Sequence, residues 1–342
     1  MLGESHPGDV TTIQAGINAA ANGDTVEVSP GTYIENINFN GKLITVTSRG
    51  GPTVTIIDGG AKDSVVSFKS SESALTELAG FTLKNGSAGS DNFLQGGGIF
   101  INYSSPIISG NVVENDIGCG AGIAIVGGAP LIENNTIREN TGSCDGAGIG
   151  LSGADSATIS HNLITANLSS SGNGGGIAMD GAGTPLIVNN TISANIASGL
   201  GPASEGGGIY IVNDSDPMIV QNLIVNNVAG QAGGVYIRVL SGSPGPLLVN
   251  NTIAGNQTGM AQGSAVYAGG FDGGSMFVNN LMIGASGQNA VFCDSSSSLY
   301  HRASRTTTPS ARAALDSKAL APVRWAPPAI FPWNPILLLL SR

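Results

Sequence analysis

The sequence is poor in charged residues, aromatic residues and cysteine, and it has no long apolar run. Of its 342 residues, 11% are charged and 5% are aromatic, whereas an ordinary globular domain carries about 25% charged residues. Three Cys are too few for a disulfide framework. No apolar run approaches the ~20 residues that a membrane-spanning helix needs. A cysteine-stapled scaffold and a transmembrane helix are therefore excluded.

Positive charge is especially scarce in most of the chain. Residues 1–298 contain seven Lys or Arg against 22 Asp or Glu, while residues 299–342 contain six Lys or Arg and one acid. Phosphate binding needs clustered positive charge, so this acidic body argues against a nucleic-acid partner. It also makes an anionic polysaccharide an awkward ligand unless a cation bridges the two.

Glycine, in contrast, is abundant, with 52 residues. The glycines follow no three-residue period, which excludes collagen. An apolar content of 41% is enough to build a core, so the chain is not disordered. This composition is typical of a fold whose backbone is mostly sheet and tight turn.

A run of small residues that leads into a strand recurs along the chain. Its copies are GGGIFI at Gly96, GAGIAI at Gly120, GAGIGL at Gly146, GGGIAM at Gly174, GGGIYI at Gly206, AGGVYI at Ala232, GSAVYA at Gly263 and a weaker NAVFCD at Asn289. The aligned Ile and Val residues recur on average about every 27 residues.

Two further elements interleave with this run. One is an apolar segment usually opened by Pro, such as SPII, APLI and TPLI, and the other is an Asn bend followed by a strand, such as NNTIREN, HNLITAN and NNTISAN. The aligned bend residues are Asn111, Asn135, Asn162, Asn190, Asn222, Asn251 and Asn280. Each period therefore predicts strand, short turn, strand, Asn bend, strand and variable loop.

The repeat predicts an all-β fold, namely a right-handed single-stranded parallel β-helix of three sheets and about 10 coils. Strands of three to five residues are too short to be stable alone, and they bury alternate side chains against the next coil. The bend Asn tolerates a left-handed backbone, and stacked copies are expected to hydrogen-bond one another as a ladder. The NNT triplets at Asn134, Asn189 and Asn250 also spell glycosylation sequons, but HNL, QNL and NNL keep the Asn without the Thr, which favours the bend interpretation.

The two ends differ from the repeat. TTIQAGINAAANGD predicts a short amphipathic helix with Ile13 and Ile17 on one face, suited to covering the open end of the stack. Residues 299–342 contain no Gly and hold both Trp. We interpret them as disordered, or as non-native sequence after a reading-frame error near Ser298, with a real basic tail as the alternative. The expected organisation is a cap segment at 1–22, the β-helix at 23–298 and a non-repeat tail at 299–342.

Cys119 and Cys144 lie 25 residues apart, about one repeat, and each precedes a matching strand by four or five residues. Neighbouring strands stack about 4.8 Å apart, within the Cα separation that a disulfide tolerates. The spacing is compatible with a disulfide between adjacent coils and also with two small buried thiols.

No signal peptide is visible, because MLGESHPGDV has neither a basic region nor an apolar one. Either the protein is cytosolic or the sequence lacks its true beginning. The extracellular or cell-surface location that we expect implies the second.

The stretch TIQAGINAAANGDTVEVSPGTYIENINF resembles the start of many pectin-lyase-like β-helix proteins, and the GGGI, P-x-I and NNTI coils are similar to the repeat of bacterial right-handed β-helix proteins. The resemblance covers about residues 9–294 and implies the architecture. It implies little about a reaction, because the superfamily includes lyases, hydrolases, esterases, epimerases, surface proteins and phage tail proteins.

Three catalytic patterns known from enzymes of this superfamily are not found in the sequence. There is no esterase-type GxxDFIFG segment, no paired-Asp motif of the polygalacturonase kind, and no Asp cluster with nearby Lys and Arg as in calcium-dependent pectate lyases. In these families the chemistry usually lies on the sheet that follows the variable loop. The resemblance therefore directs attention to the GGGI sheet.

One outward column of the GGGI sheet ends in four aromatic residues. Alternation places on it Phe100, Ala124, Gly150, Ala178, Tyr210, Tyr236, Tyr267 and Phe292. The last four would span roughly 14 Å at about 4.8 Å per coil. Exposed aromatic faces can stack on sugar rings, which makes Tyr210, Tyr236, Tyr267 and Phe292 the expected ligand-binding residues. The alternative is an aromatic ladder that only stabilises the sheet.

The second outward column offers candidates for catalysis. It contains Asn102, Val126, Ser152, Asp180, Val212, Arg238, Gly269 and Asp294. Arg238 could act as the base of a lyase, with Asp180 on a cation, whereas a glycosidase needs two carboxylates about 5–9.5 Å apart. The alternative is a solvated charge pair.

Other acids lie in loops and turns. Asp145 and Glu205 belong to variable loops, and the turns after the GGGI strands carry Asp155, Asp214, Asp216 and Asp272. They could bind Ca²⁺, although single acids per coil are weaker ligands than a DxD-type loop, and no other cofactor is expected. His161 replaces Asn in an NNTI unit, which favours a bend residue over a catalyst.

These observations favour an extracellular or surface β-helix that binds polysaccharide and has no identifiable catalytic motif. One alternative is a polysaccharide lyase or glycoside hydrolase built around Asp180, Arg238 and the aromatic column. The other is a structural surface repeat or adhesin. The sequence does not indicate the oligomeric state.

Overall fold

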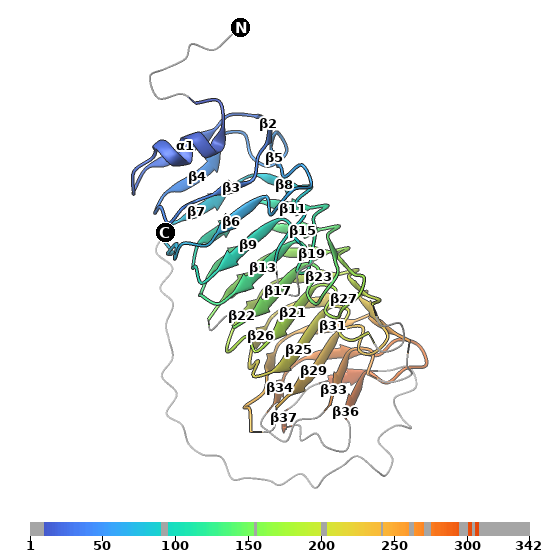
Figure 1. Ribbon diagram of the computed structural model, residues 1–342. Helices are drawn as coiled ribbons and strands as arrows, with labels where there is room; N and C mark the ends of the chain where they lie inside the picture. The colour runs from blue at the N-terminus through green and yellow to red at the C-terminus, as the bar shows by residue number, and fades with distance from the viewer. Residues whose placement is uncertain are drawn as a thin grey trace, which may run out of the picture.

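The computed structural model describes residues 10–89, 95–153, 156–199, 204–240, 242–259, 263–269 and 275–293, together with the backbones of two strands at 300–302 and 305–307. These residues form a right-handed parallel β-helix of about nine turns, with one short helix near the N-terminus (Figure 1). The fold predicted from the repeat is confirmed. The strands stack into long parallel sheets that run along the solenoid.

Four sheets, here named A to D, are built from strands that recur once per coil. Sheet A contains β1 (Thr25–Val28), β4 (Thr45–Ser48), β7 (Glu77–Ala79), β10 (Ile107–Ser109), β14 (Leu131–Glu133), β18 (Thr158–Ser160), β22 (Leu186–Val188), β26 (Met218–Val220), β30 (Leu247–Val249), β34 (Met276–Val278) and β37 (Tyr300–Arg302). Sheet B contains β2 (Gly31–Ile34), β5 (Thr55–Asp58), β8 (Thr82–Lys84), β11 (Val112–Glu114), β15 (Thr136–Arg138), β19 (Leu163–Thr165), β23 (Thr191–Ser193), β27 (Leu223–Val225), β31 (Thr252–Ala254), β35 (Leu281–Ile283) and β38 (Arg305–Thr307). Sheet C, the GGGI sheet, contains β3 (Ile37–Asn38), β6 (Val66–Phe68), β9 (Ile99–Asn102), β13 (Ile123–Val126), β17 (Ile149–Ser152), β21 (Ile177–Asp180), β25 (Ile209–Asn213), β29 (Val235–Val239), β33 (Val266–Ala268) and β36 (Val291–Cys293).

Sheet D is a short addition to the three sheets expected from the sequence. It contains the two-residue strands β12 (Ile117–Gly118), β16 (Thr141–Gly142), β20 (Leu168–Ser169), β24 (Ile196–Ala197), β28 (Val228–Ala229) and β32 (Gln257–Thr258). A coil therefore runs A, B, D, variable loop, C. Strands of two residues leave no alternation to detect, which is why the sequence pattern did not reveal them.

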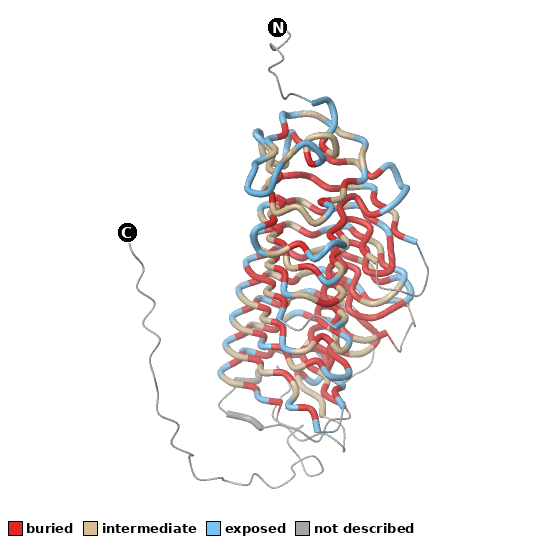
Figure 2. Tube along the Cα trace, turned by 60° about the vertical axis from the view of Figure 1, so that its left-hand side comes forward, coloured by how far each residue is buried: buried red, intermediate tan, exposed pale blue. Residues whose placement is uncertain are grey.

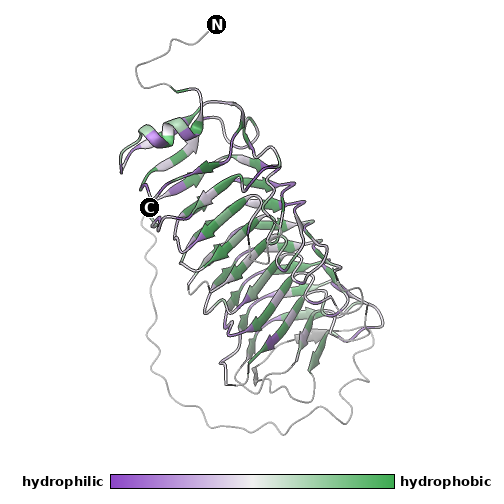
Figure 3. Ribbon diagram, in the orientation of Figure 1, coloured by the Kyte–Doolittle hydropathy of each residue, from purple (hydrophilic) through white to green (hydrophobic). Residues whose placement is uncertain are grey.

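The core is a set of stacked aliphatic columns inside the coils. In sheet A the middle residue of each strand points inward, and Ile108, Ile132, Ile159, Ile187 and Ile219 are all fully buried. The strands are mostly apolar (Figure 3), and the buried positions follow the length of the solenoid (Figure 2). Burying one such side chain contributes roughly 1.5–3 kcal/mol, so the repeated Ile stabilises each coil through its neighbours.

The Asn bend between sheets A and B uses two adjacent residues. The bend residues Asn111 to Asn280 are almost fully buried, and each side chain bonds the next one; for example, Asn135 Nδ2 donates to Asn162 Oδ1 at 3.1 Å and to the Ile108 carbonyl at 2.9 Å. The left-handed backbone belongs to the residue before, such as Asn134 and His161, both at φ 56°.

The prediction that the buried Asn itself takes the left-handed conformation is therefore wrong. A buried side chain that must aim at both neighbouring coils needs a regular backbone, so the exposed residue ahead of it takes the strained one. His161 is such a bend residue, as its place in the repeat predicted.

A second column of the same design lies between sheets B and D. Its buried members are Asp116, Asn140, Asn167, Asn195, Asn227 and Asn256. From Asn140 onward each side chain bonds the next, as at the first bend; Asn140 Nδ2 donates to Asn167 Oδ1 at 3.0 Å and to the Val113 carbonyl at 3.1 Å. This column turns the chain once more and so creates sheet D.

Helix α1 (Ile13–Ala19) covers the N-terminal end of the solenoid (Figure 1). Ile13 and Ile17 are buried, as the amphipathic pattern predicted. The Glu35 carboxylate accepts the main-chain N–H of Ile13 at 2.9 Å, at the positive end of the helix. Lys42 Nζ donates to three carbonyls at the other end, including that of Ile17 at 2.8 Å. The first coil thus binds both ends of its own cap.

Cys119 and Cys144 form a disulfide between adjacent coils, with Cα atoms 4.6 Å apart. Of the two possibilities that the spacing left open, the structure has the bridge. The predicted tail at 299–342 lies outside the described residues, apart from the backbones of β37 and β38, which continue sheets A and B.

Candidate functional site on the outer face of sheet C

The aromatic column of sheet C has the expected register. Neighbouring strands pair Ala178 with Tyr210, Tyr210 with Tyr236, Tyr236 with Tyr267 and Tyr267 with Phe292. The four aromatic side chains therefore come from four consecutive coils, β25, β29, β33 and β36. Alternation in single strands was enough to place them on one line.

The four rings stack on one another. Ring centroids are 5.6 Å apart between Tyr210 and Tyr236, 5.3 Å between Tyr236 and Tyr267, and 4.9 Å between Tyr267 and Phe292. Tyr236 is only 3% exposed. The expectation of four exposed ring faces is therefore corrected, because each inner face is covered by a neighbouring ring. Whether these residues bind a ligand stays a prediction.

The turn before each strand explains why an outward column is so well covered. Gly206, at φ +64°, folds back over β25, and a Cβ there would clash with the Ile209 carbonyl oxygen and lie 3.0 Å from Tyr210 Cα. The glycine run thus brings the preceding loop against the first outward position of its own strand. Polar side chains of that loop are placed beside the aromatic column.

Tyr210 ends the aromatic stack. The next position in the column is Ala178, which pairs with Tyr210 across the strands, and beyond it comes Gly150. The Tyr210 face on the Ala178 side is consequently not covered by another ring of the column. Tyr210 is half-buried, in contrast to Tyr236.

Glu205 is the centre of the polar groups at this end of the stack. It lies four residues before β25, and the hydroxyls of Tyr236 and Tyr210 are near enough to its carboxylate to lower its pKa. Burial raises the pKa of Glu205, while the Tyr236 hydroxyl, the Arg238 charge and the Tyr210 hydroxyl oppose the rise, and Asp145 adds to it. Burial and the Glu205 charge in turn raise the pKa of both Tyr hydroxyls.

Glu205 belongs to a polar column of its own. Asp145, Asn173 and Glu205 occupy the same place in three successive coils, and the main-chain N–H groups link them: that of Asn173 donates to Asp145 Oδ1 at 2.6 Å, and that of Glu205 donates to Asn173 Oδ1 at 2.8 Å. Burial raises the pKa of Asp145, the main-chain N–H of Asn173 lowers it, and the charge of Asp180 raises it.

The two catalytic candidates lie on either side of this group. Asp180 and Arg238 share a column with Val212 between them, as expected. They form no ion pair within the described residues, and Asn213 Nδ2 donates to the exposed Asp180 carboxylate. Both charges nevertheless act on the same centre, because Asp180 raises the pKa of Tyr210 and Arg238 lowers that of Glu205.

The remaining acids that the structure describes form no cluster that could hold a cation. Within the described residues, no group of three His, Cys, Asp or Glu is placed to hold a metal ion. Asp216 Oδ1 accepts the Ser243 hydroxyl and the Gly245 main-chain N–H, both at 2.6 Å, as a turn residue does. Asp155, Asp272 and Asp294 lie outside the described residues.

A family model described as "Right handed beta helix region" matches residues 90–299. The chain belongs to the right-handed β-helix family. No curated protein sequence matches this β-helix protein. Within its described part, no helix has the length and apolar character needed to cross a membrane.

Three solved structures are similar to this β-helix protein at low sequence identity. The catalytic unit of a thermostable α-1,3-glucanase from Streptomyces thermodiastaticus is 15% identical with a TM-score of 0.46, and the match covers 86% of this chain and 65% of the glucanase unit. The A-module of a mannuronan C-5 epimerase from Azotobacter vinelandii is 17% identical with a TM-score of 0.46, covering 88% and 84%. The receptor binding domain of the siphovirus 9NA tailspike is 11% identical with a TM-score of 0.31, covering 87% and 74%.

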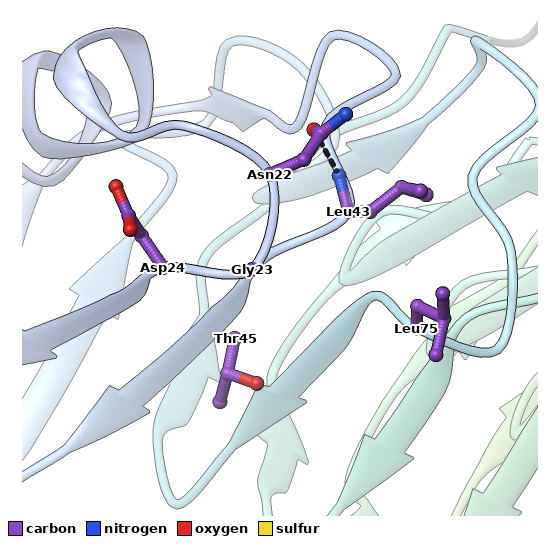
Figure 4. A pocket seen from close by; sticks show the side chains of 6 residues that line it. All are labelled: Asn22, Gly23, Asp24, Leu43, Thr45 and Leu75. Carbon is purple, nitrogen blue, oxygen red and sulfur yellow. Dashed lines mark hydrogen bonds between the residues drawn. The ribbon is translucent and has the colours of Figure 1, made fainter.

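A hollow near the cap of the β-helix holds none of the predicted site residues. It is lined by Asn22, Gly23, Asp24, Leu43, Thr45 and Leu75 (Figure 4). Asn22 Oδ1 accepts the Leu43 main-chain N–H at 3.0 Å and Asp24 Oδ2 that of Ala21 at 2.7 Å. These polar atoms already serve the local turns.

Sequence reasoning missed the central role of Glu205. A signal was present, because the residue four places before the first Ile or Val of each sheet C strand is polar in four successive coils: Asp145, Asn173, Glu205 and Gln231. That the Tyr hydroxyls reach back to this column could not be known from alternation within strands.

Proposed function

We propose that this β-helix is an extracellular or surface protein that binds glycans on the outer face of sheet C, at Tyr210, Glu205, Tyr236 and Arg238. The supporting observation is the half-buried Glu205 carboxylate at the end of the aromatic stack; burial raises its pKa, and the Tyr236 and Tyr210 hydroxyls beside it lower it. A carboxylate has about four lone-pair sites, so two remain for the hydroxyl groups of a sugar. The Tyr210 ring, at the end of the stack, supplies an apolar face beside them.

Two features support the extracellular part of the proposal. The Cys119–Cys144 disulfide is a bond that persists in oxidising environments and is rare in the cytosol. The low charge and the regular stacking of the solenoid suit a rigid body that presents one long face. The aromatic residues Tyr267 and Phe292 extend the proposed binding line along that face.

Binding is tested by isothermal titration of the chain with a panel of polysaccharides. Tyr210→Phe and Tyr236→Phe keep the stacked rings and remove only the hydroxyls. Each hydroxyl positions the Glu205 carboxylate that is proposed to meet the sugar, so each change is expected to weaken binding severalfold. Tyr33→Phe is the matched control, because Tyr33 lies in β2 of sheet B, in the first coil, and its hydroxyl donates to the Ser29 carbonyl. Unchanged affinity in both site variants would contradict the proposal.

A second candidate function is cleavage of the bound glycan, favoured by the two carboxyl groups with raised pKa. Asp145 and Glu205 lie two coils apart, roughly 10 Å by backbone spacing, close to the upper end of the separation in inverting glycosidases. Asp180 and Arg238 provide the lyase alternative. New chain ends that disappear in Glu205→Gln, Asp180→Ala or Arg238→Ala would establish an enzyme. Binding without new chain ends supports the binding protein.

A further inference from the structure

Three carboxylates from consecutive coils surround the end of the aromatic stack. Asp145 lies four residues before β17, Asp180 ends β21, and Glu205 lies four residues before β25. These strands are neighbours in sheet C. The charges of all three acids act on the Tyr210 hydroxyl and raise its pKa, in addition to the effect of burial.

Among the residues that the structure describes, positive charge near this place is limited to one residue. Between residues 139 and 298 the chain has nine Asp or Glu, and Arg238 is its only Lys or Arg. Arg238 lies in β29, on the Tyr236 side of Glu205, and its charge acts on Glu205 and Tyr236. From residue 139 to residue 237 the chain has no Lys or Arg, so the coils that carry Asp145 and Asp180 supply no cation to oppose the carboxylates.

A bridging cation has no prepared site there either. Calcium takes six to eight oxygen ligands, usually from several carboxylates on one loop. The described part of the chain holds no group of three potential ligands suited to a metal. Asp145 is already used by the Asn173 main-chain N–H, and Asp180 by the Asn213 side chain.

We propose that the ligand of this face is an uncharged glycan and that the three carboxylates select against polyuronates. This inference rests on the proposed function and adds the substrate class. A carboxylate sugar placed against Tyr210 would meet Asp145, Asp180 and Glu205 at short range. Repulsion between two like charges at about 4 Å amounts to about 1 kcal/mol even in water. The hydroxyl groups of a neutral sugar meet the same carboxylates as hydrogen-bond acceptors.

The test compares polymers that differ only in charge. The chain is titrated with polygalacturonate and with alginate, each beside its carboxyl-reduced form, and with uncharged glucan, mannan and xylan. All titrations are made at low ionic strength, with calcium and with a chelator. At least one uncharged polymer is expected to bind, and the polyuronates are expected to bind about tenfold more weakly or not at all, with calcium as without.

A charge variant connects the selectivity to the site. Asp180→Asn removes one exposed carboxylate and is expected to raise the affinity for polyuronate relative to its reduced form by about twofold to fivefold. Glu133→Gln, on the outer face of sheet A, removes the same charge from another face and is expected to leave the ratio unchanged. The ratio change should disappear at high salt.

The possible failures are distinguishable. Polyuronate binding as tight as that of the uncharged polymers, or a ratio that Asp180→Asn does not move, overturns the inference and leaves glycan binding in place. Absence of binding to every polymer overturns the proposed function and the inference together.

Discussion

Asp116 heads the second buried column, and its main-chain N–H donates to Oδ1 of Asn140, the next member, at 3.0 Å. Asp116 Oδ1 accepts the Gly86 main-chain N–H at 2.7 Å, but Oδ2 is buried without a hydrogen-bond partner. In the coil above, Asn140 uses the corresponding side-chain nitrogen to bond the Val113 carbonyl. Asp116 is therefore the one acid in a column where the other members donate hydrogen bonds from an Asn side-chain nitrogen.

Replacing Asp116 with Asn should stabilise the protein. An Asn side chain supplies the missing donor, and leaving a buried polar group unsatisfied costs about 1–3 kcal/mol. The denaturant midpoint of Asp116→Asn at neutral pH is expected to rise accordingly, with an unchanged slope. The reciprocal change, Asn140→Asp, should lower it. A fall in the midpoint of Asp116→Asn would show that Oδ2 is satisfied in solution.

The same residue predicts a dependence of stability on pH. Burial raises the pKa of Asp116 well above its ordinary value of 3.8; the Gly86 N–H opposes the rise, and the charges of Glu114 and Asp58 add to it. A raised pKa means that the folded state holds the proton more tightly. This contribution is present below the unfolded pKa and is lost as pH rises through the folded one. The advantage of Asp116→Asn should therefore grow with increasing pH.

Ala166 and Ala194 hold the left-handed backbone at the second bend, at φ 56° and 55°. Both side chains are exposed, and the left-handed conformation costs a non-Gly residue roughly 1–2 kcal/mol. Ala166→Gly and Ala194→Gly are each expected to raise the free energy of unfolding by about 1 kcal/mol. Ala20→Gly is the control, because Ala20 lies at φ −65° and Gly there only adds freedom to the unfolded chain. Thermal denaturation should show a higher midpoint for Ala166→Gly and Ala194→Gly and a lower one for Ala20→Gly.

The Cys119–Cys144 disulfide should stabilise the adjacent coils. It closes a loop of 25 residues, for which the chain-entropy model gives about 3 kcal/mol. The double variant Cys119→Ser with Cys144→Ser is expected to lose that amount of unfolding free energy. The loss would appear as a lower denaturant midpoint. Mass spectrometry of the native protein after alkylation should show two further alkylated cysteines only after reduction. Equal alkylation without reductant would disprove the bridge.

Removing the Tyr236 hydroxyl should change the titration of Glu205. Among the groups that lower the pKa of Glu205, the Tyr236 hydroxyl is the strongest. Tyr236→Phe is therefore expected to raise that pKa further, as seen in the ¹³C shift of the Glu205 carboxyl during a pH titration. Tyr33→Phe should leave the shift curve unaltered. If Tyr236→Phe also leaves it unaltered, the hydrogen bond to Glu205 is absent.

The sequence predicted the solenoid, the buried faces of its strands, the cap helix and the register of the aromatic column. All of these follow from local alternation and from a period of about 27 residues, which places equivalent residues above one another. Ile13 and Ile17 were found in the same way, by their helical spacing. Local sequence patterns are sufficient to predict the position of a residue wherever that residue contacts only its equivalent in the next coil.

Tertiary structure decided which side chains come together between columns. Asp180 and Arg238 were placed correctly along sheet C, but only the fold-back of the loop at Gly206 brings Glu205 to the Tyr210 and Tyr236 hydroxyls. Packing of Tyr236 with Val212 and Ala232, and with the Tyr210 and Tyr267 rings, leaves it 3% exposed. The path of that loop depends on packing against strands far away in the sequence. Periodicity therefore determined the scaffold of this protein, and the packing of its loops determined the site.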